Sequence, residues 1–272
     1  MSALDTMFAS LKKEGRKAIA PFFTVGDPDP EFTIECVRAI DRAGADLCEL
    51  GVPYSDPLAD GPVIQASYTR ALEKGLSLDN VLETSRTAVS KVSMPLVAMV
   101  SYSIIYRRGI DRFVGNAVDA GLSGLVVPDL PIEEADELDR LCRQRDLGLV
   151  RLVAPTTPQE RALAIVRKAT GFVYCVSVSG ITGERRELPA DLLERIEWLR
   201  EKSNVPILVG FGISSPEQVR SLCKVADGVI VGSAIVRHLS NIATTSRSHV
   251  IGEIEAHVRT LVAAVREKIK VR

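Results

Sequence analysis

Short apolar runs alternate with amphipathic stretches of helical period along this chain, from about Ala18 to the C-terminus. Eight of the apolar runs predict strands: Ala18–Thr24, Leu47–Gly51, Leu96–Val100, Gly124–Val127, Leu149–Val153, Phe172–Val176, Ile207–Gly210 and Gly228–Val231. Three of the intervening helices have a capping-type residue before a proline at the expected first helical position, namely Asp29-Pro30, Thr157-Pro158 and Ser215-Pro216.

Eight nearly uncharged strands, each followed by a helix, are what a closed parallel barrel covered by its own helices requires. The length of 272 residues lies within the range of such barrels. We therefore expect an α/β fold, an eight-stranded parallel β/α (TIM) barrel, in one domain spanning residues 1–272. Residues 1–15 should form an extra N-terminal helix over the lower end of the barrel. An open doubly wound sheet is the structural alternative.

Charge and residue counts exclude several classes of function. Lys and Arg number 34 against 35 Asp and Glu, and no long basic run stands out, so we expect no nucleic-acid partner. No stretch approaches about 18 uncharged apolar residues, so we expect a cytoplasmic protein without a membrane segment. Five cysteines without a CxxC pair predict reduced, mostly buried thiols. The only histidines, His238, His249 and His257, follow the last strand, which argues against histidine triads and histidine metal sites.

Carboxylic acids near the end of the second strand are the first candidates for catalysis, because barrel active sites form where strands end. Glu49 has apolar neighbours, and burial would raise its pKa and suit it to acid/base work. Asp60 closes the following proline-rich loop and could bend over the barrel mouth, whereas Asp56 would face outward. The structural alternatives are a bonded, non-catalytic Glu49 and a capping or turn role for both aspartates.

Two rival chemistries are weighed against these acids. Mg²⁺ could be held by Glu49, Asp56 and Asp60, but Asp129 alone supplies a further acid at another strand end, so we expect no metal. A lysine Schiff base would need a lysine at the carboxyl end of a strand, and no lysine falls there. The chemistry should therefore be proton transfer by carboxylates.

Glycine-rich segments follow three consecutive predicted strands: Ser179–Gly183, Gly210–Ser214 and Gly232–Ala234. Glycine allows close approach to backbone N–H groups, and the loops after strands seven and eight commonly bind phosphate in barrels, although glycine is also the ordinary turn residue. A phosphorylated substrate is predicted. Four aromatic residues at the same end could line a flat apolar pocket beside the phosphate, namely Phe22, Tyr102, Tyr174 and Phe211.

The run from Glu49 to Pro62 resembles the signature of the tryptophan synthase α subunit family. Further segments match that family in the same order along essentially the whole chain: Pro21–Pro28, Pro128–Pro131, Ser179–Gly183, Gly210–Ser214 and Gly232–Val236. The resemblance implies retro-aldol cleavage of indole-3-glycerol phosphate to indole and glyceraldehyde 3-phosphate in tryptophan biosynthesis. It implies no cofactor in this chain.

Residue roles follow from the same resemblance. Glu49 would protonate the indole ring carbon and help deprotonate the glycerol hydroxyl, and Asp60 would stabilise positive charge at the indole nitrogen. Gly183, Gly212, Gly232 and Ser233 would hold the phosphate. The implied substrate-binding residues are Phe22, Tyr102, Tyr174, Thr182, Gly183, Phe211, Gly212, Gly232 and Ser233.

The resemblance also implies a partner, a β subunit that carries pyridoxal phosphate, in an αββα heterotetramer. Pro53, Asp56 and Asp129 match positions linked to loop closure or subunit contact, and residues 52–62 and 178–189 would be lids. One departure is Ser103-Ile104, where many members have Asn-Pro, near the expected partner surface. The alternatives are a stand-alone indole-3-glycerol-phosphate lyase and a catalytically silent, phosphate-binding regulatory subunit.

Overall fold

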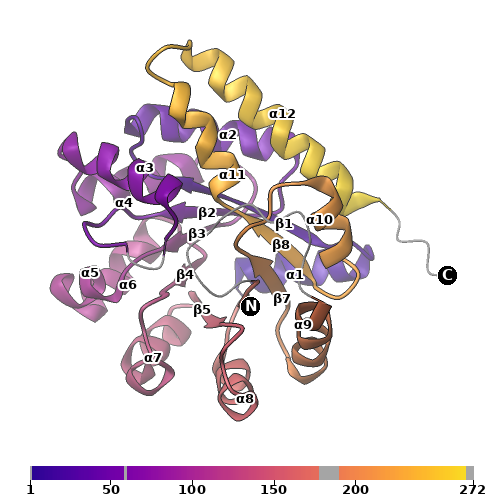
Figure 1. Ribbon diagram of the computed structural model, residues 1–272. Coiled ribbons are helices and arrows are strands. Elements are labelled where there is room, and N and C mark those ends of the chain that lie inside the picture. Colours follow the sequence, from indigo (N-terminus) through magenta and orange to yellow (C-terminus); the bar gives the residue numbers. More distant parts are fainter. Residues whose placement is uncertain (1, 58–59, 178–189, 268–272) are drawn as a thin grey trace.

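Eight parallel strands form a closed barrel in the computed structural model, which describes residues 2–57, 60–177 and 190–267 (Figure 1). The strands follow one another around the barrel in chain order, and the last pairs with the first through the register Ala18↔Gly228 to Pro21↔Val231. The predicted TIM barrel is confirmed, and the open doubly wound sheet is not formed.

The strands lie where the apolar runs predicted them, with ends that differ by at most one residue. Their bounds are β1 Ala18–Thr24, β2 Cys48–Gly51, β3 Leu96–Met99, β4 Gly124–Val126, β5 Gly148–Val153, β6 Val173–Val176, β7 Ile207–Gly210 and β8 Gly228–Val231. Nearly every strand residue is buried, because one face lines the barrel interior and the other packs under the helices. This two-sided burial explains why the runs carry so few charges.

Helices surround the barrel and connect successive strands (Figure 1). Their bounds are α1 Ala3–Lys13, α2 Pro30–Ala43, α3 Pro62–Glu73, α4 Leu78–Val89, α5 Tyr102–Arg108, α6 Ile110–Asp119, α7 Asp136–Gln144, α8 Gln159–Lys168, α9 Ala190–Lys202, α10 Pro216–Leu222, α11 Ser233–Val236 and α12 Arg247–Arg266, with short 3₁₀ turns η1 Ile132–Glu134 and η2 Arg237–Asn241. The last helix, α12, packs beside α2, so the two ends of the barrel wall also meet in the outer layer. Among the described residues, no helix is both long enough and apolar enough to span a membrane.

Two of the three predicted proline-preceded helix starts are confirmed. Asp29 caps α2 by accepting from the backbone N–H of Phe32, and Ser215 forms a capping box at the start of α10. The third prediction is wrong: α8 begins one residue later than expected, after Pro158, and Thr157 does not cap it. The Thr157 hydroxyl instead accepts from the backbone N–H of Ala154, 3.0 Å away, and so closes the turn before the helix.

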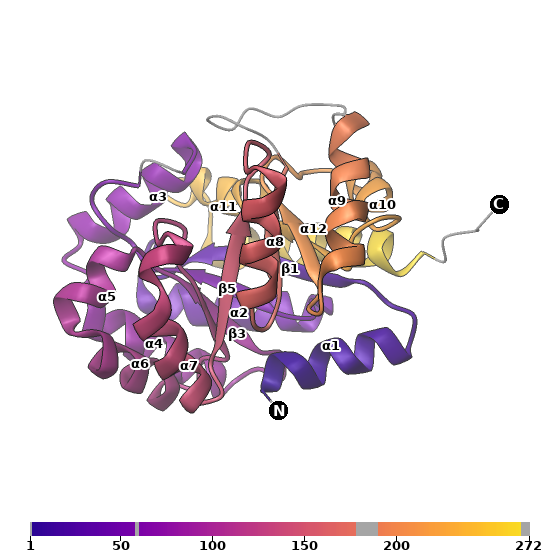
Figure 2. The ribbon, with the colours of Figure 1, turned by 90° about the horizontal axis from the view of Figure 1, so that it is seen from below.

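The lower end of the barrel is covered by α1, as predicted from residues 1–15 (Figure 2). The buried face of this helix, Leu4, Phe8 and Leu11, packs against the inward-facing side chains at the bottom of the strands. A methyl carbon of Leu4 lies about 3 Å from where a Cβ would stand on any of three glycines there: Gly124, Gly148 and Gly171. The absence of side chains at these glycines leaves room that Leu4 fills. All five cysteines are buried and unpaired, in agreement with the predicted thiols.

Candidate active site

A small cavity of about 50 Å³ lies among the upper ends of the strands and brings together most of the predicted site residues. Its lining residues are Phe22, Glu49, Asp60, Gly61, Ile64, Met99, Tyr174, Phe211, Gly212, Ile230, Gly232 and Ser233. The carboxyl ends of β1, β2, β3, β6, β7 and β8 all contribute, which is where barrel enzymes build their active sites.

Glu49 points into the barrel from the middle of β2, in register with Phe22 on β1 and Val97 on β3. The side chain is 2% exposed, and among the described residues its Oε1 has no hydrogen-bond partner. Burial, and to a smaller extent the charge of Asp60, together raise the pKa of Glu49 to about 8. The carboxyl group is therefore protonated at neutral pH and can donate a proton.

Asp60 turns back over the barrel mouth, as the loop sequence predicted, and is 7% exposed. Its own backbone is fixed on both sides: the N–H donates to the carbonyl of Pro57 at 3.0 Å, and the carbonyl accepts from Gln65 Nε2 at 2.8 Å. Helix α3 has Gly61 as its N-cap, without a side-chain hydrogen bond, so Asp60 does not cap that helix. Burial raises the pKa of Asp60 to about 6, which leaves it mostly ionised at neutral pH.

Two aromatic rings reach the cavity because glycines stand beside them. A Cβ on Gly51 would overlap the ring of Phe22, and a Cβ on Gly210 would overlap the hydroxyl and ring of Tyr174. Tyr174 also meets Phe211 edge to face, with 6.0 Å between ring centroids. Burial, followed by the charges of the two acids, raises the pKa of Tyr174 well above its usual value, so the phenol stays neutral.

Two of the three predicted phosphate segments contribute Gly212, Gly232 and Ser233 to the lining of the cavity, and the third, Ser179–Gly183, lies outside the described residues. After β7, Phe211 and Gly212 both adopt left-handed conformations, with φ of 76° and 71°, and the carbonyl of Phe211 accepts from the hydroxyl of Ser177. A left-handed phenylalanine is strained by about 1 kcal/mol or more and needs such support. After β8, Gly232 precedes Ser233, the first residue of α11. Successive amides in this kind of arrangement suit an anion.

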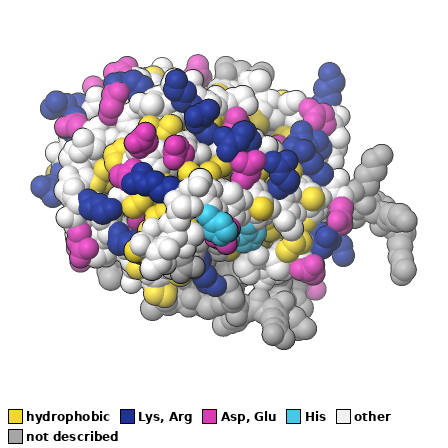
Figure 3. Space-filling view, turned by 90° about the horizontal axis from the view of Figure 1, so that it is seen from above, with side chains coloured by type: hydrophobic (Ala, Val, Ile, Leu, Met, Phe, Trp, Pro, Cys, Tyr) yellow, Lys and Arg dark blue, Asp and Glu magenta, His cyan; other side chains and the backbone are white. Residues whose placement is uncertain are grey.

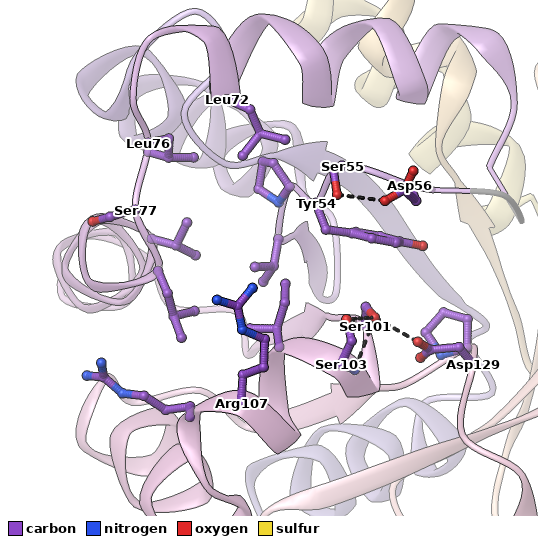
Figure 4. A pocket seen from close by; sticks show the side chains of 17 residues that line it. Tyr54, Ser55, Asp56, Leu72, Leu76, Ser77, Ser101, Ser103, Arg107 and Asp129 are labelled. Carbon is purple, nitrogen blue, oxygen red and sulfur yellow. Dashed lines mark hydrogen bonds between the residues drawn. The ribbon is translucent and has the colours of Figure 1, made fainter.

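Pro53, Asp56 and Asp129, which match positions linked to loop closure or subunit contact, lie together in a second cavity of about 800 Å³ (Figure 4). All three line this cavity, and Figure 4 shows Asp56 and Asp129 on either side of the Tyr54 ring. Asp129 is held by Ser101 Oγ at 2.7 Å and by the backbone N–H of Tyr102 at 2.8 Å. Both residues of the Ser103-Ile104 departure line this cavity as well.

Three predicted substrate-binding residues are not part of the small cavity as described. Tyr102 begins α5, and its ring lies tilted against that of Tyr106, with 6.2 Å between the ring centroids. Thr182 and Gly183 lie outside the described residues, as does the predicted lid 178–189.

The Mg²⁺ triad weighed from the sequence is not assembled. Asp56 is exposed, accepts from Ser55 Oγ at 2.8 Å and lines the second cavity, whereas Glu49 and Asp60 line the first. Within residues 2–57, 60–177 and 190–267, no cluster of three or more potential ligand side chains could hold a metal ion. Among these residues no lysine lines the small cavity, which agrees with the prediction that no lysine lies at the carboxyl end of a strand.

Four lining residues were not predicted from the sequence: Gly61, Ile64, Met99 and Ile230. Met99 and Ile230 could have been found, because each lies two residues after an inward-facing residue of its strand, Val97 and Gly228, and therefore points to the same face. Gly61 and Ile64 depend on the direction in which α3 leaves the loop, which strand periodicity does not define.

A family model and curated relatives match nearly the whole chain. Residues 8–266 match a family model described as tryptophan synthase alpha chain. The chain is 50% identical over 251 residues to the tryptophan synthase alpha chain of Rhodopirellula baltica, covering 91% of this chain and 90% of that one. It is 46% identical over 267 residues to that of Microcystis aeruginosa, covering 98% and 100%.

Solved structures show the same likeness. The crystal structure of the tryptophan synthase alpha chain from Legionella pneumophila superposes with a TM-score of 0.89 at 32% identity and covers 100% of both chains. A chain of tryptophan synthase from M. tuberculosis, in an aminoacrylate-bound form, gives a TM-score of 0.86 at 31% identity and covers 98% of this chain and 100% of that one.

Proposed function

The chain belongs to the tryptophan synthase alpha chain family, enzymes of tryptophan biosynthesis, and from this premise we propose that it cleaves indole-3-glycerol phosphate to indole and glyceraldehyde 3-phosphate. One observation carries the proposal: two carboxyl groups share a small, largely apolar cavity at the barrel mouth, and their pKa values are raised unequally, to about 8 for Glu49 and about 6 for Asp60. Groups whose pKa values differ in this way can act as acid and anion at one pH.

Glu49 supplies the proton. Its neutral carboxyl protonates the ring carbon that bears the glycerol chain, and the positive charge that results is shared with the indole nitrogen. The carboxylate of Asp60 stabilises that charge, and the apolar surroundings strengthen the attraction.

Cleavage then restores the starting state of Glu49. The carbon–carbon bonding pair moves into the ring and neutralises it, while the glycerol carbon forms a carbonyl. The Glu49 carboxylate takes the proton of the hydroxyl on that carbon. One proton is given and one is recovered, so the reaction needs neither an electron-accepting cofactor nor a metal.

The phosphate group is proposed to bind at the backbone of Gly212, Gly232 and Ser233, which line the same cavity as Glu49. Phe22 and Phe211 would border the indole, and Tyr174 the glycerol chain. At about 50 Å³ the cavity is far smaller than the usual site for a molecule of this size, so we expect the lining side chains to move apart when substrate binds.

We further propose that the second cavity meets a tryptophan synthase β subunit, and that two of each subunit form an αββα heterotetramer. Support comes from the family and from the clustering of Pro53, Asp56 and Asp129 around one groove. In this proposal the pyridoxal phosphate belongs to the β subunit. Ser103 and Ile104 would then contact or border the partner.

The decisive experiment measures indole release from indole-3-glycerol phosphate by the purified chain, with a chelator present, and with a β subunit added or omitted. We expect release that the chelator does not change and the β subunit increases. No release under either condition would support the silent regulatory alternative. Steady turnover that a β subunit leaves unchanged would support the stand-alone lyase, and light scattering of the mixture would report the stoichiometry of any complex.

A further inference from the structure

Three buried oxygen atoms near the carboxyl ends of β1 and β2 have no hydrogen-bond partner among the described residues: Thr24 Oγ1, Glu49 Oε1 and the Tyr68 hydroxyl. The other buried side-chain atoms without a partner in this part of the chain are guanidinium nitrogens, on Arg145, Arg151 and Arg195. Polar side chains on the surface have solvent or charged neighbours, and Figure 3 shows both signs of charge interspersed over one face of the molecule. A buried polar atom has neither, and leaving it unpaired costs free energy.

The three oxygens surround Gly51, the last residue of β2. Thr24 stands opposite Gly51 in the parallel register of β1 and β2, and Glu49 lies two residues before it, on the same face of β2. Thr24 follows the cavity-lining Phe22 by two residues, so it faces the barrel interior as well. The Tyr68 hydroxyl lies 2.8 Å from the position that a Cβ on Gly51 would occupy. Three elements, β1, β2 and α3, therefore bring these oxygens to one place in the interior.

Tyr68 reaches this place from α3. It follows Ile64 by one helical turn, so the two side chains share a face of the helix, and Ile64 lines the small cavity. Tyr68 is 1% exposed, and its ring centroid lies 5.7 Å from that of Tyr54. Burial raises the pKa of Tyr68 well above its usual value, so its hydroxyl keeps the hydrogen at neutral pH and stays a donor.

Hydroxyl groups suit both states that Glu49 adopts in the proposed reaction. The hydroxyls of Thr24 and Tyr68 each have one hydrogen to donate and lone pairs that accept, so each can pair with a neutral carboxyl or with a carboxylate. The bond to the carboxylate is the stronger one, because its acceptor is charged. Since Glu49 Oε1 has no partner among the described residues, a rotation of the carboxyl toward the hydroxyls breaks no hydrogen bond of that atom.

We propose that Thr24 and Tyr68 are positioning residues for Glu49: their hydroxyls bind its Oε1, directly or through one shared water molecule, and stabilise the carboxylate that forms when Glu49 protonates the substrate. This inference rests on the proposed function, in which Glu49 is the acid. Neither residue lines the small cavity, so each acts on the proton transfer through Glu49 and leaves substrate binding nearly unchanged.

The test removes one hydroxyl at a time with little change of shape, in Thr24→Val and in Tyr68→Phe. The high-pH limb of the kcat/KM profile, which reports proton loss from Glu49, should move up by about one pH unit, because the carboxylate loses a hydrogen bond. At neutral pH we expect kcat to fall about tenfold, with the KM for indole-3-glycerol phosphate within about twofold. Thr24→Ser keeps a hydroxyl and should keep the limb and kcat near those of the wild type.

Other titratable groups near Glu49 leave this limb clear. Asp60 titrates at lower pH, with a pKa of about 6, and burial raises the pKa values of Cys48 and Tyr174 so far that both stay neutral across the profile. The matched control is Thr84→Val. It also removes a buried hydroxyl, but one that donates to the Asn80 carbonyl on α4 at 2.7 Å and lines neither cavity. Its pH profile should match that of the wild type.

A readout independent of turnover is Tm as a function of pH. Above about pH 8, where Glu49 is ionised, the Tm of Thr24→Val and of Tyr68→Phe should lie about 2–4 °C below that of the wild type. The difference should shrink toward about pH 6, because the neutral carboxyl accepts a weaker hydrogen bond. A hydroxyl without a partner would give the opposite sign, since its removal takes an unpaired polar atom out of the interior.

Four outcomes would overturn the inference: a high-pH limb at the wild-type position in either variant, no recovery in Thr24→Ser, an equal shift in Thr84→Val, and a Tm at or above that of the wild type above about pH 8. Failure of the proposed function is separate. The wild-type chain would then release no indole, while the pH-dependent difference in Tm would still test the hydrogen bonds to Glu49.

Discussion

Glu49 and Asp60 line the same cavity, and the charge of Asp60 adds to burial in raising the pKa of Glu49. Burial alone raises the pKa of Asp60, and by less. At neutral pH one acid of the cavity, Glu49, is therefore a proton donor, and the other, Asp60, is an anion. If both were ionised, two negative charges would meet in an apolar site, and the pair resists that state.

This division predicts a bell-shaped pH profile of kcat/KM. Activity should rise as Asp60 ionises near pH 6 and fall as Glu49 loses its proton near pH 8, with the two apparent values belonging to the coupled pair. The measurement is kcat/KM over a pH range that brackets both values. Asp60→Asn should reduce turnover strongly. The pH profile of its residual activity should no longer rise near pH 6, because the group that ionises there is gone. Its activity should decline at a lower pH than that of the wild type, because a neutral amide no longer raises the pKa of Glu49. A flat profile would contradict the assignment.

Glu49→Gln should abolish cleavage, because glutamine has a similar shape but cannot transfer the proton. Phosphate binding should stay nearly intact. It should also change the pH dependence of stability. Since the folded-state pKa of about 8 exceeds the ordinary 4.5, the folded chain holds a proton that the unfolded chain loses, so wild-type stability falls as pH rises between these values. The contribution approaches about 1.4 kcal/mol per pH unit, and the glutamine variant should lack it. Urea unfolding of both proteins at several pH values in that range measures the free energy of unfolding as a function of pH. If that free energy changed with pH equally in both proteins, Glu49 would not be a buried, protonated group.

Gly210→Ala should damage both folding and catalysis. The new Cβ would overlap the Tyr174 ring, which is enclosed in the barrel and cannot move without disturbing the cavity. We expect a loss of about 1–3 kcal/mol in the free energy of unfolding and a lower kcat/KM. Gly115→Ala is the control, because a Cβ there meets no atom within 4 Å and α6 should gain slightly from alanine. Wild-type activity in Gly210→Ala would show that the ring position does not matter.

Leu4→Ala should separate stability from activity. Leu4 is fully buried at the lower end of the barrel, so its removal leaves a cavity and should cost about 2–5 kcal/mol, while the kcat of the folded fraction stays unchanged. The exposed Lys12 of the same helix supplies the control Lys12→Ala, with an expected change within about 0.5 kcal/mol. A lowered kcat in Leu4→Ala, measured well below its Tm, would mean that the two ends of the barrel are coupled.

The sequence predicted the barrel because burial on both faces produces short uncharged runs, and it predicted Glu49 because a charged residue interrupts such a run. Position relative to neighbouring elements was harder to predict. Tyr102 follows β3 as expected, but Asp129 accepts from its backbone N–H, α5 starts there, and its side chain does not line the small cavity. The His238–His257 contact joins residues 19 positions apart on two elements, so it depends on how η2 packs against α12. Local patterns contain neither piece of information.

The pairing of β1 with β8 has a consequence for the order of folding. Contacts that join the ends of the wall are far apart in the chain, such as Asp29 with Arg247 at a separation of 218 residues and Arg42 with Glu255 at 213. Closing so long a loop is slow, and these contacts stabilise nothing until it is closed. A growing chain cannot complete its barrel before β8 has left the ribosome. The backbone groups of β1 that pair with β8 therefore stay unpaired through most of synthesis.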